Sequence, residues 1–231
     1  LHPPFCPLPT VFILIIALPP GEIIGGQEAK PHSKPYMAYL QIRSGEKSSF
    51  CGGFLVSGNF VLMAAHCWVL AGEGGWRLRI PHHQYNNDNN DIMLLALAQR
   101  AKLNTWVDTI ALPRANERVK PGTMCSITGW GRTGCGPNPT SCRRWTWRCW
   151  RMTRLKNPHH SYRHYNASTM MCGGDPEKGK GSWKGDSGGP MVCRKTAQGI
   201  VSWGYCCPPK VFARVSPFIP WIQDKMSKLQ P

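Results

Sequence analysis

Residues 185–190 read Gly-Asp-Ser-Gly-Gly-Pro, and this stretch says more about the fold than any other. Flanking glycines allow a serine to sit in a sharp turn with its hydroxyl exposed. Backbone N–H groups in such a turn can converge on one point and stabilise an oxyanion. Two upstream motifs accompany it, Ala-Ala-His-Cys at 64–67 and Asn-Asp-Ile-Met-Leu-Leu at 90–95. The order of His66, Asp91 and Ser187 predicts a nucleophilic serine site.

Taken together, these motifs resemble the chymotrypsin family of serine proteases, in the branch of granzymes, cathepsin G and mast-cell chymases. The similarity extends to four further motifs and covers most of residues 23–231. These are Ile-Ile-Gly-Gly-Gln-Glu at 23–28, Cys-Gly-Gly-Phe at 51–54, Thr-Gly-Trp-Gly at 128–131 and Ser-Trp-Gly at 202–204. The resemblance implies an all-β fold of two antiparallel six-stranded barrels, with a C-terminal helix and the active site between the barrels.

The same resemblance divides the chain. Residues 1–20 look like a secretory signal, although an apolar tail without function is the alternative. Residues 21–22 look like an activation dipeptide, and residues 23–231 like one trypsin-like protease domain. The expected parts of that domain are barrel halves at about 23–112 and 120–215 and a helix at 217–229.

Hydrophobic periodicity supports this fold independently of the resemblance. Residues 36–42 alternate between two faces, which is typical of a strand, and many other short apolar runs are separated by Gly, Pro and Asn. Apolar residues recur at helical spacing after residue 217, with Ser216 as the expected N-cap.

The family pattern assigns the chemistry. Ser187 would be the nucleophile, His66 its general base, and Asp91 the residue that orients His66. The backbone N–H groups of Gly185 and Ser187 would form the oxyanion hole.

Activation would follow the family pattern too. Cleavage after Glu22 would free the α-amino group of Ile23, which would pair with Asp186 in the interior. A dipeptidyl peptidase is the expected activating partner.

Substrate selection would depend on a few positions. Gly181 should form the floor of the pocket, and Ser202, Trp203 and Gly204 should offer backbone to the substrate. Lys210 should point to the back of the same pocket and favour Asp or Glu before the scissile bond. The alternative is a preference for large apolar residues, with Lys210 turned toward solvent.

The resemblance also pairs Cys51 with Cys67, and Cys125 with Cys193. Asn166 begins an Asn-Ala-Ser glycosylation sequon. The cysteines and histidines do not fall at zinc-site spacing, so neither a metal nor another cofactor is expected.

Composition limits the partners and the compartment. Eleven cysteines and an apolar N-terminal stretch favour an oxidising, secreted or granule location. A formal charge of +16 favours a polyanionic partner, such as acidic proteoglycan or an anionic membrane, and a basic surface without a dedicated partner is the alternative. The family resemblance adds protein substrates and serpin-type inhibitors as expected partners. No regular basic and aromatic pattern points to nucleic acid.

The chain departs from the family between His66 and Asp91, where only 24 residues intervene. The family has nearly twice as many, so we expect the first barrel to be incomplete. Loss of a strand could separate His66 from Asp91. A catalytically inactive homologue and a cationic granule protein are therefore the alternatives to a working serine endopeptidase.

A second departure lies at residues 142–153, which are rich in Trp and Arg. One possible codon choice, shifted by a single base, encodes Leu-Gln-Glu-Val-Asp-Leu-Glu-Val-Leu-Glu-Asp-Asp, which resembles the family here. In that frame the formal charge would fall from +16 to about +6. Sequencing of the transcript distinguishes the two frames.

Overall fold

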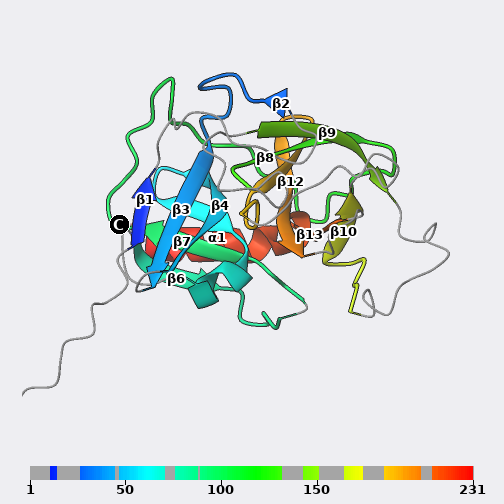
Figure 1. Cartoon of the computed structure of the whole chain (residues 1–231). Helices are drawn as coiled ribbons and strands as arrows, with labels where there is room; N and C mark the ends of the chain where they lie inside the picture. The colour runs from blue at the N-terminus through cyan, green and yellow to red at the C-terminus, as the bar shows by residue number, and fades with distance from the viewer. Residues whose placement is uncertain are drawn as a thin grey trace, which may run out of the picture.

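The computed structural model describes residues 11–14, 27–44, 47–70, 76–87, 89–131, 143–150, 164–173, 185–203 and 210–230. Two antiparallel sheets lie side by side, and the one α-helix among the described residues lies near the C-terminus, behind the first sheet in this view (Figure 1). The expected mostly-β architecture with a C-terminal helix is present. None of the helices in the described part of the chain has the length and apolar character needed to cross a membrane.

The first sheet has six strands and is not closed into a barrel. Their order is β1 (Val11–Leu14), β3 (Met37–Ser44), β4 (Lys47–Ser57), β5 (Phe60–Met63), β7 (Met93–Leu97) and β6 (Trp76–Pro81). No pairing joins β1 to β6 among the described residues. Among the described residues between His66 and Asp91, β6 is the only strand. The short spacing therefore leaves this sheet open, as expected.

β1 comes from the segment expected to resemble a secretory signal. It pairs antiparallel with β3, in a register that runs from Val11↔Ile42 to Leu14↔Tyr39. An unpaired sheet edge is open to association with other chains. The upstream segment therefore covers four residues of the β3 edge in the uncleaved chain.

The second sheet has seven strands. Their order is β10 (Met170–Gly173), β13 (Lys210–Arg214), β12 (Thr196–Trp203), β11 (Pro190–Cys193), β8 (Met124–Gly129), β9 (Arg143–Trp150) and β2 (Gln27–Glu28). β10 also pairs with β9, which links two distant strands of this sheet. The seventh strand differs from expectation, since residues 27–28 were assigned to the first half. They belong to the second sheet because Gln27 and Glu28 pair with Arg144 and Arg143.

The Trp- and Arg-rich segment provides β9. Its eight residues include six that pair in sequence with β8, from Arg143↔Gly129 to Arg148↔Met124. The segment thus forms a strand of the second sheet, and the shifted reading frame stays a prediction.

The C-terminal helix starts later than expected. A 3-10 turn, η4 (Ser216–Phe218), precedes α1 (Ile219–Leu229). The expectation that Ser216 is the N-cap of this helix is wrong. Phe218 holds that position, and the Ser216 hydroxyl donates a hydrogen bond to the Glu117 carbonyl at 2.6 Å. Ile219 and Ile222 of α1 pack into the main hydrophobic core.

His82 lies at the contact between the first sheet and this helix. It follows β6, is 8% exposed, and meets Phe218 and Trp221 edge-on at ring distances of 4.9 and 5.2 Å. The His83 ring lies 4.4 Å away. Burial lowers the pKa of His82 below its ordinary value of 6.5, and the neighbouring His83 lowers it further.

This environment predicts a pH-dependent stability. The unfolded chain protonates His82 near pH 6.5, whereas the folded chain resists protonation until a lower pH. His82 therefore contributes stability that is complete above pH 6.5 and declines as the pH falls toward the folded pKa. We expect His82→Phe to lose less free energy of unfolding than the wild type in urea titrations between about pH 7.5 and 5.5. Equal losses of unfolding free energy in the wild type and in His82→Phe would contradict the predicted effect of His82.

Candidate active site

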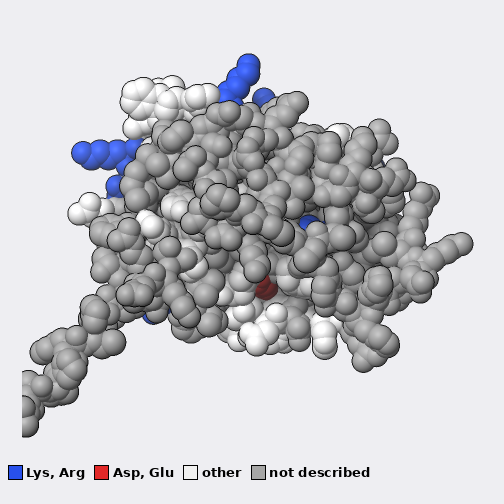
Figure 2. Space-filling model, viewed as in Figure 1, with Lys and Arg blue, Asp and Glu red and all other residues white. Residues whose placement is uncertain are grey.

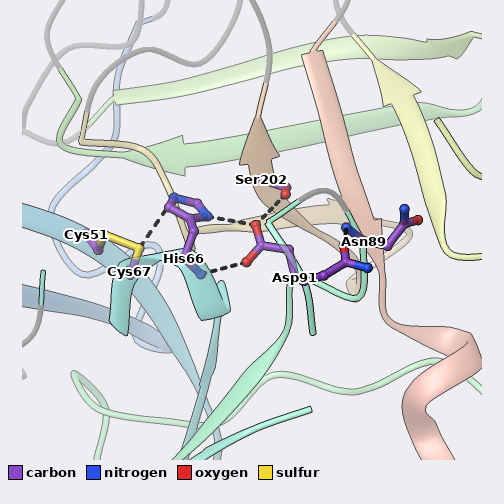
Figure 3. Close-up of polar contacts among 7 residues, drawn as sticks. Cys51, His66, Cys67, Asn89, Asp91 and Ser202 are labelled. Carbon is purple, nitrogen blue, oxygen red and sulfur yellow. Dashed lines mark hydrogen bonds and ion pairs between the residues drawn. A yellow bond between two sulfur atoms is a disulfide. The ribbon is translucent and has the colours of Figure 1, made fainter. Parts of the chain in front are cut away.

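His66 and Asp91 lie in direct contact. Nδ1 of His66 lies 2.7 Å from Oδ2 of Asp91, and the His66 backbone N–H donates to Oδ1 at 2.8 Å (Figure 3). The sheet explains the meeting, because β5 pairs with β7 and Met63 lies opposite Met93. His66 follows Met63 by three residues, and Asp91 precedes Met93 by two. The separation that the short spacing could have caused does not occur, since β5 and β7 hold the two residues together although the sheet is open.

Their environment adjusts both pKa values. Burial has the largest influence on His66 and would lower its pKa, but the hydrogen bond and the charge of Asp91 outweigh it, so the pKa is raised above 6.5. Burial would raise the pKa of Asp91, yet its bonds to His66 and Ser202 and the His66 charge keep the pKa low. Asp91 is only 5% exposed. A buried carboxylate thus stabilises the protonated imidazole that a general base becomes.

Ser202 has a role that the sequence did not reveal. Its hydroxyl donates a short hydrogen bond to Oδ2 of Asp91, the same oxygen that meets His66 (Figure 3). Ser202 was singled out only for its backbone, as part of a substrate-binding strand. It lies 111 residues from Asp91, and no spacing signal connects them.

The Ser187 turn packs against the first sheet close to His66. Gly52 of β4 donates its N–H to the Ser187 carbonyl at 2.7 Å. A Cβ added at Gly188, whose φ is +84°, would collide with the Gly52 carbonyl and lie 3.3 Å from the backbone N of Ala64. Glycine is required here because both the backbone conformation and the close approach exclude a side chain. This turn therefore sits beside the residues that lead into His66.

Ser187 and His66 do not form a hydrogen bond in the described structure. Nε2 of His66, the nitrogen not used by Asp91, lies 3.7 Å from Sγ of Cys67 (Figure 3). Catalytic hydrogen bonds are often long in proteins without substrate. The structure thus assembles the His66–Asp91 half of the expected triad and places the Ser187 turn beside it.

The expected oxyanion donors lie in the same turn. Gly185 has a φ of +102°, and a Cβ there would collide with the Phe50 ring. The Gly188 and Gly189 N–H groups bond to the Val201 and Asp186 carbonyls. Among the described residues, neither the Gly185 nor the Ser187 N–H donates a hydrogen bond to another group.

The Asp186 carboxylate packs against Gly129, which ends β8, and against Gly131 just beyond it. Asp186 is 1% exposed, and the Gly131 N–H donates to its Oδ1 at 2.8 Å. A Cβ at Gly129 or Gly131 would collide with the carboxylate. In the sequence, Thr-Gly-Trp-Gly at 128–131 stood out only as a family motif. This packing explains why its two positions 129 and 131 require glycine. Glu22 and Ile23 lie outside the described residues.

The expected substrate pocket is described only in part. Gly181 and Gly204 lie outside the described residues, while Ser202 and Trp203 end β12. Lys210 begins β13 opposite Gly173 and is 6% exposed. A lysine that is buried to this extent does not extend into solvent.

Both expected disulfides are present. Cys51 is bonded to Cys67 beside His66, and Cys125 is bonded to Cys193 between β8 and β11. Asn166 is exposed, and its Oδ1 accepts a hydrogen bond from the Ser168 N–H at 2.9 Å. Among the described residues, no group of three or more His, Cys, Asp and Glu side chains could hold a metal ion.

Comparison with known proteins identifies the family. The family model described as Trypsin matches residues 23–222. The chain belongs to the trypsin family. It is 43% identical to human (Homo sapiens) cathepsin G, covering 94% of each chain. It is 43% identical to human granzyme B and 44% identical to mast cell protease 3 of Ovis aries, covering 94% of this chain and 96% of each relative.

A solved structure described as "Structure of GrC" superimposes with a TM-score of 0.79. It is 38% identical, and the match covers 89% of this chain and all of that one. The protein is thus a trypsin-like serine protease related to granzymes and cathepsin G. Proteases of this family act on protein substrates.

Proposed function

We propose that this trypsin-like protease is a granule or secreted endopeptidase that cleaves through an acyl-enzyme. The observation that carries the proposal is the buried network in which the His66 backbone, the His66 ring and the Ser202 hydroxyl all bond to Asp91. Such a network fixes the imidazole in one orientation and one tautomer, which a general base requires. The location rests on the similarity to cathepsin G, granzyme B and mast cell proteases.

The mechanism follows from these contacts. His66 accepts the Ser187 proton at Nε2 while Oγ attacks the substrate carbonyl. The Gly185 and Ser187 N–H groups stabilise the resulting oxyanion. His66 then donates its proton to the leaving amine, and water completes the reaction by hydrolysing the ester. Substrate binding brings the Ser187 hydroxyl within hydrogen-bonding distance of Nε2, while Nδ1 keeps its contact with Asp91.

Activation follows the family pattern in this proposal. Removal of Gly21-Glu22 by a dipeptidyl peptidase exposes the amino group of Ile23. Asp186 is already buried and directly precedes the nucleophile, so its pairing with a new cation orders the Ser187 turn. Serpin-type inhibitors and acidic proteoglycan are the other proposed partners. Asn166, which is exposed in a turn, is the proposed glycosylation site.

The substrate preference in this proposal is for Asp or Glu before the scissile bond. The low exposure of Lys210 supports it, because an ammonium group that is shielded from solvent interacts more strongly with a carboxylate than an exposed one does. Large apolar residues are the alternative preference.

This preference predicts the behaviour of Lys210→Gln. We expect cleavage after Asp to fall about 10- to 100-fold in kcat/KM, since a charge-assisted hydrogen bond is lost, and cleavage after Phe to stay within about threefold. The measurement uses two peptides that differ only at that residue. Lys120→Gln, which removes an exposed charge elsewhere, should change neither rate. A wild type that prefers Phe, or equal losses on both peptides, would exclude the acidic preference.

Two observations favour a second candidate, a catalytically inactive homologue. The Ser187 hydroxyl and His66 are not hydrogen-bonded in the described structure, and the first sheet is open. The proposed function is tested by cutting the purified chain before Ile23 and following hydrolysis of a peptide library. Hydrolysis that disappears in Ser187→Ala supports the endopeptidase, and hydrolysis absent from both proteins supports the inactive homologue.

A further inference from the structure

A pocket of about 380 Å³ lies where the linker between the two sheets crosses the second sheet. The linker is fixed there, because Ala111 pairs with Thr196 in parallel and the Ala197 N–H donates to the Ala111 carbonyl at 3.0 Å. None of the described residues expected in the active site lines this pocket, so it is distinct from the described part of the active site.

Three basic side chains line the pocket, those of Lys34, Arg194 and Lys195, and its described lining contains no Asp or Glu. Arg194 and Lys195 are exposed, and neither makes an ion pair with a described residue. Among the described residues on the side shown in Figure 2, basic side chains project at the top and upper left, and acidic atoms lie near the centre. Like charges gathered around a concave surface raise the local concentration of anions.

The backbone at these two cations is strained. Arg194 and Lys195 connect β11 to β12 in a two-residue turn, with φ values of 50° and 68°. A turn with two left-handed residues favours Asn-Gly. A bulky residue in this conformation costs about 1–2 kcal/mol. The turn conformation alone would disfavour Arg and Lys, yet the chain has both residues here. Backbone strain of this kind is concentrated at functional sites.

The pocket also has an apolar side. Ile110 is buried at its wall, Val192 is half-buried, and Met124 is 51% exposed. A sulfated glycan would have nothing to place against these side chains. A peptide that carries an apolar side chain between acidic ones would use the apolar wall and the cations together.

We propose that this pocket binds an acidic peptide segment with a central apolar side chain. The carboxylates pair with Arg194 and Lys195, and the apolar side chain packs on Ile110 and Met124. The peptide belongs to a partner or substrate protein that is held at a second point, apart from the bond to be cut.

The test measures binding by fluorescence anisotropy to the full chain carrying Ser187→Ala, so that no peptide is cleaved. The probe is labelled Asp-Glu-Phe-Glu-Asp, and the matched probe replaces Phe with Ser. Arg194→Asn combined with Lys195→Gly removes two charges and installs the residues that the turn favours, so this variant should fold at least as well. Lys102→Asn combined with Lys120→Asn removes two exposed charges elsewhere.

We expect the turn variant to weaken binding of the Phe probe about tenfold or more, and the control variant about twofold or less. The Ser probe should bind about tenfold more weakly than the Phe probe. Equal weakening by the two variants, or equal affinity for the two probes, would overturn the proposal. Displacement of the Phe probe by a sulfated oligosaccharide of equal affinity would also overturn it, because a general polyanion surface would then explain the site.

Discussion

Asp91→Asn should lower kcat about 10⁴-fold, because the amide cannot hold His66 in the tautomer that accepts the Ser187 proton. It should also move the pH profile. Burial alone would lower the pKa of His66, and the hydrogen bond and charge of Asp91 raise it above 6.5. In the wild type, kcat/KM should therefore rise with pH through a midpoint above 6.5, since the active imidazole is neutral. In the variant this midpoint should move to lower pH.

Ser202→Ala provides the matched comparison. It removes one hydrogen bond from the same carboxylate oxygen but leaves the charge and the contact with His66. We expect a loss of about tenfold and a midpoint close to that of the wild type. If Asp91→Asn were no more harmful than Ser202→Ala, the buried Asp91 would not be the group that orients His66.

Gly131→Ala should damage both stability and activity. The added methyl group would collide with the Asp186 carboxylate, which is 1% exposed and bonded to the Gly131 N–H. Displacing this carboxylate leaves a buried charge without its donor, at a cost of about 2–4 kcal/mol. Because Asp186 directly precedes Ser187, kcat/KM should fall along with the free energy of unfolding measured in urea.

Gly122→Ala is the control for adding a methyl group to a glycine in a turn. Gly122 has a φ of +88°, and nothing lies within 4 Å of its added Cβ. The variant should lose only about 1–2 kcal/mol of stability, because alanine introduces backbone strain at this φ, and it should keep its activity. A Gly131→Ala protein that behaves like this control would show that the Asp186 site tolerates the methyl group.

The sequence predicted the parts of the site that short motifs encode. His66, Asp91 and Ser187 each lie in a motif whose order points to one chemistry, and the Cys51–Cys67 pair follows from the same resemblance. The fold class followed because period-two alternation marks strands. These features are local, so they can be predicted without a structure.

Features that depend on long-range register could not be predicted. The short spacing between His66 and Asp91 suggested separation, but the pairing of β5 with β7 decides their distance. The bond from Ser202 to Asp91 and the packing of Gly131 on Asp186 join residues far apart in the chain. Ser216 was expected to cap α1 from its residue type, yet the 3-10 turn η4 comes between them and Phe218 takes the N-cap position.

The central claim is that His66, held by Asp91, activates Ser187. Labelling with a fluorophosphonate, which reacts only with an activated serine, tests this most directly. The chain is cut before Ile23, labelled near pH 8, and analysed by peptide mass spectrometry. We predict stoichiometric labelling on the peptide that contains Ser187, lost in Ser187→Ala and strongly slowed in Asp91→Asn. A folded, correctly cut protein that remains unlabelled at Ser187 would contradict the account.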